Sequence, residues 1–82
     1  MNEVPGKINV YEKRFGNIAV DQGFITVEQL ISAIEIQMKE EIHKGERRLI
    51  GQILLEMNVI TSDQIKQVLS VLFEDENEPQ QH

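Results

Sequence analysis

The sequence predicts an all-α fold in which four helices form a tandem repeat of two helical hairpins. The first observation is internal similarity: residues 15–37 align without a gap over residues 50–72, and so long a match indicates one structural unit present twice. The second observation is periodicity, because apolar residues recur at helical spacing in both copies and no segment carries a strand signal. Together they predict a small domain built only from helices.

Five positions are identical in the two copies, and many more are apolar in both. When the sequence is shifted by 35 residues, the identical pairs are Gly16/Gly51, Ile18/Ile53, Ile25/Ile60, Thr26/Thr61 and Gln29/Gln64. Apolar residues of the first copy also meet apolar partners in the second, at positions 15, 18, 19, 20, 24, 25, 30, 33, 34 and 36. Each copy is therefore expected to form a short helix, a turn and a longer helix, over residues 14–44 and 48–73.

Length, composition and charge bound the class of protein. The 82 residues suffice for one domain, and the absence of cysteine excludes disulfides and thiolate metal sites. The net charge of −6 owes much to residues 74–82, which we expect to form a disordered acidic tail, whereas residues 1–73 carry eight basic and ten acidic side chains. The sequence shows neither a signal peptide nor an apolar stretch of membrane-spanning length, so a cytoplasmic location is expected.

The first copy begins after a flexible lead-in at residues 1–9. Asn9 offers an N-cap with Glu12 three residues on, which predicts a first helix over residues 10–22. Gly23 follows, where a left-handed backbone costs glycine nothing. A capping box over residues 26–29 opens a second helix that closes at residues 43–45. The predicted apolar stripe of this second helix consists of Val27, Leu30, Ile31, Ile34, Met38 and Ile42.

The second copy repeats this order. A third helix is expected over residues 48–57, and Asn58 replaces glycine at the left-handed position, which asparagine tolerates best after glycine. A second capping box over residues 61–64 opens the fourth helix, which is expected to end near residue 73. The residues expected to face inwards are Leu49, Ile50, Ile53, Leu54, Met57, Ile65, Val68, Leu69, Leu72 and Phe73.

Two glycines, Gly16 and Gly51, lie inside or at the start of predicted helices, where glycine costs about 1 kcal/mol relative to alanine. One explanation is a close helix crossing, since a missing side chain lets two backbones approach. The other is a ligand that approaches exposed backbone amides beside the basic residue Arg14. The sequence leaves both explanations open.

Residues 14–37 resemble the motif of the MshEN family, the N-terminal domain of type II secretion and type IV pilus assembly ATPases. That motif opens R-L-G, continues with aliphatic residues and an internal glycine, and closes L-x-x-x-L-x-x-Q. The matching residues are Arg14, Gly16, Val20, Gly23, Phe24, Ile25, Leu30, Ile34 and Gln37, with Phe15 in place of leucine and Ala19 smaller than the motif asks. The resemblance covers residues 10–73 and implies the family fold for that region.

The MshEN family binds cyclic di-GMP with two such motifs, so the resemblance implies a site for this ligand. The residues that would form it are Arg14, Gly16, Ile18, Val20, Leu30, Gln37, Arg48 and Gly51. Arginine would fork onto a phosphate or a guanine edge, and glycine would admit a phosphate to backbone amides. Aliphatic side chains would cover the guanine faces, and Gln37 would bond a base edge.

The second copy departs from the motif at three positions. Leu49 stands where arginine is expected, Asn58 replaces the internal glycine, and Leu72 replaces the closing glutamine. Arg48 is adjacent to Leu49, but a helix turns about 100° per residue, so Arg48 would point elsewhere unless it precedes the helix. These changes keep the apolar frame of the fold and weaken the case for a complete two-motif site.

The sequence favours a protein that is not an enzyme. It lacks the phosphate loop G-x-x-x-x-G-K-[S/T], so it is not the ATPase that usually follows the domain. Its histidines, His43 and His82, form no metal cluster, and the carboxylate pair Glu40-Glu41 is expected on an exposed face that offers no catalytic environment. The acidic balance disfavours duplex DNA as a partner.

Two functions remain open. The first is a cyclic di-GMP sensor that acts on secretion, pilus or motility machinery. The second is a nucleotide-independent docking module with the same fold, whose partner would be a secretion or pilus ATPase or another protein. Cyclic di-GMP is the ligand that the first function implies, and neither function implies a cofactor.

Self-association is a further expectation. Four apolar residues fall beside the main stripes and would need cover: Ile31, Ile36, Leu55 and Val71. Contiguous exposed apolar surface usually marks an interface, and a two-fold homodimer is the commonest closed solution.

Overall fold

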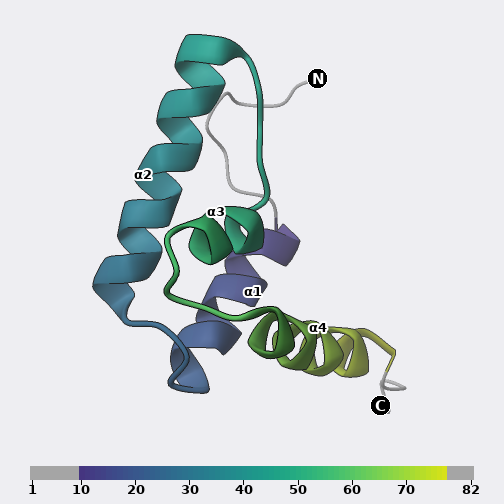
Figure 1. The fold of residues 1–82 in the computed structure, drawn as a ribbon. Coiled ribbons are helices and arrows are strands. Elements are labelled where there is room, and N and C mark those ends of the chain that lie inside the picture. Colours follow the sequence, from purple (N-terminus) through teal and green to yellow (C-terminus); the bar gives the residue numbers. More distant parts are fainter. Residues whose placement is uncertain (1–9, 78–82) are drawn as a thin grey trace.

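Four helices make up the part of the chain that the computed structural model describes, residues 10–77. They are α1 (Val10–Asp21), α2 (Val27–Lys44), α3 (Ile50–Glu56) and α4 (Ser62–Asn77). Residues 10–77 contain no strand, so the predicted all-α class is confirmed (Figure 1). The predicted lead-in at residues 1–9 and the last five residues of the predicted tail lie outside the described residues.

Two helix boundaries differ from the sequence prediction. α3 starts at Ile50 instead of Arg48, because Leu49 has an extended backbone (φ −71°, ψ 148°) and its N–H donates to the Gln52 side chain at 3.1 Å. α4 continues to Asn77, so residues 74–77 are helical, although we predicted them within the disordered tail. Glutamate is a good helix former, and nothing in this acidic run breaks the helix.

The two long helices begin in the same way. Thr26 Oγ1 accepts from the Gln29 N–H at 3.1 Å, while Gln29 Oε1 accepts from the Thr26 N–H at 2.9 Å. Thr61 and Gln64 repeat this capping box at 3.1 and 3.0 Å. The turns before them contain the left-handed residues Gly23 (φ 81°) and Asn58 (φ 65°), as the sequence predicted. Local hydrogen bonds therefore set how each chain segment enters its long helix.

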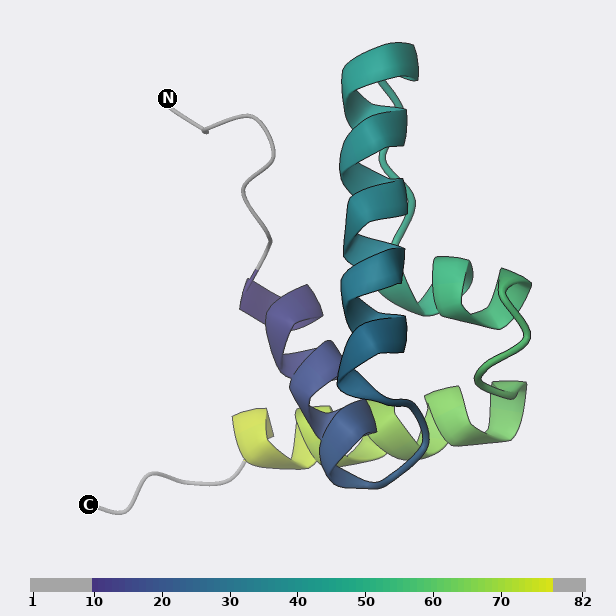
Figure 2. The same cartoon turned by 90° about the vertical axis from the view of Figure 1, so that its left-hand side faces the viewer.

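The closest helix packing joins the two copies. α1 packs chiefly against α4, and α2 packs chiefly against α3, so each long helix lies on the short helix of the other copy. Figure 2 shows α1 in front of α4, while α2 runs beside α3 and then extends beyond the other helices. Packing within each predicted hairpin is weaker than packing between them, and the arrangement as two hairpins stays a prediction.

The buried side chains follow the sequence repeat. Each buried position of the first copy matches a buried position of the second: Phe15/Ile50, Ala19/Leu54, Ile25/Ile60, Ala33/Val68 and Gln37/Leu72. Ile53 completes the core, and its counterpart Ile18 is half-buried against it. The two copies therefore contribute equivalent sets of residues to a single core. Among the side chains described, Gln37 is the one polar member of this core.

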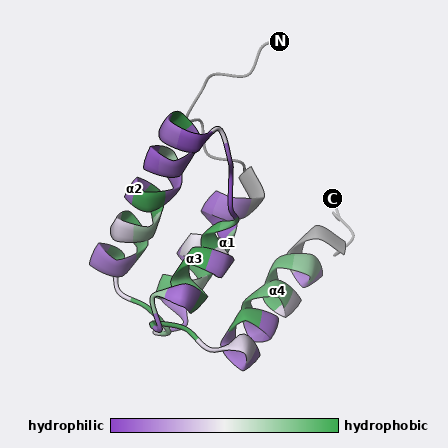
Figure 3. Ribbon diagram, turned by 45° about the horizontal axis from the view of Figure 1, so that its top comes forward, coloured by the Kyte–Doolittle hydropathy of each residue, from purple (hydrophilic) through white to green (hydrophobic). Residues whose placement is uncertain are grey.

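Most of the apolar residues that we predicted at helical spacing along α2 do not face the core. Val27, Met38 and Ile42 are 53%, 37% and 71% exposed, whereas the buried residues of α2 are Ala33 and Gln37. α2 carries two apolar stripes, and helical periodicity does not say which of them faces the core. Figure 3 shows hydrophobic and hydrophilic residues alternating along α2, which leaves hydrophobic side chains on more than one face.

Other apolar residues also differ from their predicted environment. Leu49 and Phe73, expected to face inwards, are 58% and 53% exposed. Leu49 precedes α3 and has an extended backbone, so its side chain does not point where a helical backbone would direct it. Of the residues expected to need cover, Ile31 and Leu55 are exposed, and Ile36 and Val71 are half-buried. The molecule is 18 Å thick in its shortest dimension, less than two helix diameters, so its helices cannot all be covered on both sides.

Candidate functional site: two equivalent hollows

Two hollows in the surface lie at corresponding places of the two copies. We call the first the α1–α2 groove. It consists of two hollows that share Asn17 and Leu30, and its lining residues are Lys13, Gly16, Asn17, Ile18, Val20, Asp21, Val27, Leu30, Ile34 and Ile50. We call the second the α3–α4 pocket; its lining residues are Glu12, Phe15, Leu49, Ile50, Gly51, Gln52, Leu55, Ile65, Leu69 and Leu72. Each copy of the repeat thus has a surface hollow between its short and its long helix.

The 35-residue shift relates the two hollows. Lining residues of the groove correspond to lining residues of the pocket in the pairs Gly16/Gly51, Asn17/Gln52, Leu30/Ile65, Ile34/Leu69 and, crosswise, Ile50/Phe15. Each hollow therefore lies between the short and the long helix of one copy, and the first core residue of the other copy closes it. The chemistry of the two has diverged, because the groove includes Lys13 and the pocket has no cation.

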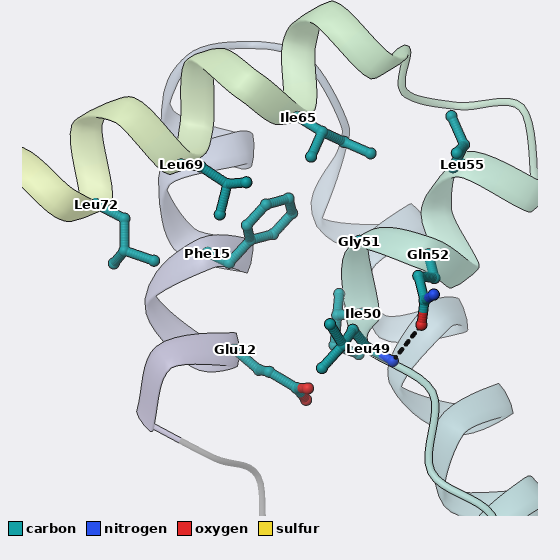
Figure 4. A pocket seen from close by; sticks show the side chains of 10 residues that line it. All are labelled: Glu12, Phe15, Leu49, Ile50, Gly51, Gln52, Leu55, Ile65, Leu69 and Leu72. Atoms are coloured by element: carbon teal, nitrogen blue, oxygen red, sulfur yellow. Dashed lines mark hydrogen bonds between the residues drawn. The ribbon is translucent and has the colours of Figure 1, made fainter.

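The α3–α4 pocket has a volume of about 220 Å³, and the surface of its wall is almost wholly apolar. Figure 4 shows the Phe15 ring directed from α1 towards α4, with Ile65 and Leu69 facing it. Leu49 and Leu55 line the pocket while remaining 58% and 40% exposed, so both present apolar surface to solvent beside it. A pocket of this kind can take an apolar group, and it offers no positive charge to a phosphate.

Close packing explains both helical glycines. A Cβ atom on Gly51 would lie 3.2 Å from Phe15 Cζ, tighter than ordinary van der Waals contact. A Cβ atom on Gly16 would lie 2.8 Å from Leu30 Cδ1. The missing side chains therefore let α3 approach α1 at one glycine and let α1 approach α2 at the other. Of the two explanations that the sequence left open, helix crossing has direct structural support.

The eight residues predicted for a ligand site do not gather in one place. Four of them line the α1–α2 groove: Gly16, Ile18, Val20 and Leu30. Gly51 lines the α3–α4 pocket. Arg14 is half-buried on α1 and lines neither hollow. Gln37 and Arg48, the remaining two, take part in contacts within the protein.

Arg48 is held by two carboxylates. Its Nε and Nη2 donate to the two oxygens of Glu40 on α2 at 3.0 and 2.8 Å, and its Nη1 donates to Glu56 at the end of α3. Hydrogen bonding from Arg48 lowers the pKa of Glu40, and hydrogen bonds to Glu40 and Glu56 raise the pKa of Arg48. The guanidinium of Arg48, which we predicted as part of the ligand site, thus has its bidentate face on Glu40.

Gln37 is buried, with 2% of its surface exposed, and its amide is used inside the fold. Its Nε2 donates to Glu12 Oε1 at 2.8 Å and to the backbone oxygen of Arg48 at 2.6 Å. Arg47 adds ion pairs to Glu12 and to Glu41, each at 3.6 Å. This polar cluster joins α1, α2 and the segment before α3. The amide group of Gln37, which we predicted to bond a base edge, is thus bonded to Glu12 and Arg48 instead.

Sequence reasoning missed the α3–α4 pocket as a site. The signal was present in the departures of the second copy from its motif, where Leu49 replaces the arginine and Leu72 replaces the glutamine. Both leucines line the pocket. Substitution of polar motif residues by leucine was an indication of an apolar site, and not only of a lost polar one.

Two classes of site find no support in the described residues. Among the residues whose side chains the structure describes, 12–74, there is no group of three His, Cys, Asp or Glu side chains placed to hold a metal ion. Among the helices of the same part of the chain, none is both long and apolar enough to cross a membrane.

Comparison of the chain with protein-family models, with curated proteins and with solved structures finds no match. The two hollows, and the polar contacts around them, are therefore the features of this chain from which a function can be argued.

Proposed function

We propose that this chain is a non-catalytic regulatory domain that docks onto another protein through the α3–α4 pocket. The observation that carries the proposal is the lining of that pocket, whose surface is almost wholly apolar over a volume of about 220 Å³. Because an apolar cavity of about 150 Å³ already holds benzene, this pocket has room for one leucine or phenylalanine side chain of a partner.

The surroundings of the pocket support a protein partner. Leu49 and Leu55 present exposed apolar surface at its wall, and a buried apolar anchor ringed by further contacts is typical of protein interfaces. Glu12 also lines the pocket, and the whole chain carries a net charge of −6. A partner segment with an apolar anchor and basic flanking residues would therefore be complementary in both shape and charge.

The resemblance to the MshEN family supplies a class of partner. It favours an assembly ATPase of a secretion or pilus system, on which this domain would act without chemistry of its own. Binding of the purified chain to such an ATPase tests the proposal. Leu55→Glu should abolish binding, because it places a charge at the pocket wall, whereas Ser70→Glu on the exposed side of α4 should leave binding unchanged. Equal binding of wild type and Leu55→Glu would contradict docking at this pocket.

A second candidate function is a cyclic di-GMP sensor, and a specific observation favours it. Gly16, Ile18, Val20 and Leu30, four of the residues that the resemblance implies, lie together along the α1–α2 groove with Lys13 at its wall. Aliphatic side chains suit guanine faces, and the lysine suits a phosphate. The sensor would then use the first copy alone and would regulate secretion, pilus or motility machinery.

Calorimetric titration with cyclic di-GMP separates the two candidates. Docking alone predicts no heat of binding at high micromolar ligand. The sensor predicts binding that Lys13→Ala weakens and that Lys66→Ala, a matched change on the exposed side of α4, leaves unchanged. Binding with this pattern would replace docking as the primary function.

A further inference from the structure

A second apolar face runs along α2. The residues on it, which we call the α2 stripe, are Val27, Ile31, Ile34, Met38 and Ile42. At 3.6 residues per turn these five positions fall within an arc of about 80° around the helix. All of them are at least partly exposed, and four are exposed outright. Ala33 and Gln37, the buried residues of α2, lie on a different side, so the stripe is separate from the core face.

The stripe is held in an open position. Figure 1 shows α2 along one side of the molecule, and Figures 1 and 2 both show its C-terminal part beyond α1, α3 and α4. The buried hydrogen bonds of Gln37 and the ion pair between Glu40 and Arg48 fix α2 on its other side. A rigid 18-residue helix whose apolar stripe is left exposed by the described residues is a surface for pairing with another helix.

We propose that the α2 stripe pairs antiparallel with the α2 stripe of a second copy of this chain. The two-fold axis passes near Ile34 and Glu35, which is the middle of the stripe. Val27 then lies opposite Ile42 of the second copy, and Ile31 lies opposite Met38 of the second copy. An isologous pair of this kind closes on itself and leaves no unsatisfied stripe. This inference goes beyond docking at the α3–α4 pocket, which is formed by other helices.

The charges beside the stripe select a second copy in antiparallel orientation. Glu28 and Lys39 lie on the same flank of α2, near opposite ends of the stripe. Antiparallel pairing brings Glu28 beside Lys39 of the second copy, and symmetry makes this ion pair twice. It also sets the positive start of each α2 beside the negative end of the other.

One charged residue opposes the pairing, and its removal offers a test of the proposed axis. Glu35 lies on the same flank at the middle of the stripe, so the two-fold axis brings it close to Glu35 of the second copy. Like charges at such a position weaken association. The five-residue stripe is also small beside a standard interface, so we expect dissociation on the order of tens of micromolar.

Sedimentation of the full chain over micromolar to millimolar concentrations tests the surface. The mass should rise from 9.5 kDa towards twice that value. Ile31→Glu and Met38→Glu should each weaken association at least about tenfold, because each buries a charge without a partner. Phe73→Glu, a comparably exposed apolar residue of α4 that lies outside the stripe and outside the α3–α4 pocket, should leave association unchanged. Circular dichroism should show that each variant keeps its helices. A wild-type chain that stays monomeric throughout, or association that Phe73→Glu weakens as much as Ile31→Glu, overturns the proposal.

Charge variants test the orientation. Glu28→Lys and Lys39→Glu should each weaken association about threefold, and the double variant should restore it. Glu35→Gln should tighten association, because it removes the repulsion at the axis. A double variant no tighter than either single variant overturns the antiparallel pairing.

Cysteine cross-linking gives an independent answer, since the chain has no native cysteine. Copper–phenanthroline oxidation should link Glu35→Cys to itself. It should leave Val27→Cys alone unlinked, and it should link Val27→Cys to Ile42→Cys when the two variants are mixed. Self-linking of Val27→Cys at the rate of Glu35→Cys indicates parallel helices and overturns the orientation.

Discussion

The side-chain amide of Gln37 donates a 2.8 Å hydrogen bond to the carboxylate of Glu12, which joins α2 to α1 across 25 residues of sequence. The same nitrogen donates to the backbone oxygen of Arg48 at 2.6 Å. Gln37 therefore joins three parts of the chain: α1, α2 and the segment that precedes α3. In the second copy the equivalent residue, Leu72, is equally buried and lines an apolar pocket.

Gln37→Leu should destabilise the fold by about 1–3 kcal/mol. Leucine fits a buried position of this size, but it removes the donor from the Arg48 carbonyl and from the Glu12 carboxylate. Urea denaturation measures the change in the free energy of unfolding. Gln67→Leu on the exposed side of α4 is the matched control and should change it little. Equal stability of Gln37→Leu and wild type would show that the buried amide contributes nothing.

Thr26→Ala and Thr61→Ala should each cost about 1 kcal/mol of unfolding free energy, because each removes the acceptor for an N–H in the first turn of a long helix. Thr→Ser at the same positions keeps the hydroxyl and should recover most of the loss. Thermal unfolding of the four variants checks this. A loss that serine fails to recover would assign the effect to the threonine methyl group instead of the cap.

Asn58→Gly should be neutral or stabilising, since Asn58 has φ 65° and glycine adopts this conformation without strain. Asn58→Ala should lower the free energy of unfolding by about 1 kcal/mol, because alanine is strained in this left-handed conformation. Urea midpoints of the two variants should therefore move in different directions. A marked loss in Asn58→Gly would mean that the asparagine side chain has a separate role.

The ion pair between Glu40 and Arg48 predicts a pH dependence. The Arg48 hydrogen bonds lower the pKa of Glu40 from its ordinary 4.5 in the folded protein. The stabilisation is therefore present above pH 4.5 and is lost as the pH falls through the lower folded value. The difference in urea midpoint between wild type and Glu40→Gln should be largest near neutral pH and should shrink in acid. A difference in urea midpoint that stays the same from neutral pH into acid would contradict this prediction.

Local signals in the sequence predicted the fold well. The threonine–glutamine boxes and the left-handed positions at Gly23 and Asn58 depend on residues within four positions of one another, and the structure has all of them. The orientation of α2 could not be predicted from such local signals. Its two apolar stripes have the same period, and the choice between them depends on α3, which lies later in the chain.

The candidate site was less predictable for the same reason. Gln37 fits a motif position that would bond a base, yet its donor groups meet Glu12 and Arg48, whose positions depend on the packing of α1 and of the segment before α3. Arg48 likewise meets Glu40 and Glu56, each eight residues away. A pattern shows which residue types are present, and it does not show which contacts inside the protein already occupy them.

The packing of α1 on α4 makes this chain a single cooperative unit. The first and last helices complete each other's core, so neither copy retains a full set of buried contacts when the other is absent. A cut between residues 45 and 49 would yield two fragments, each with a short helix deprived of its main cover. In folding, the chain must close a loop of about fifty residues before α1 gains its principal contacts, and that entropy is lost before burial repays it. Two copies that look independent in sequence are thus joined in stability, and damage to either one unfolds both.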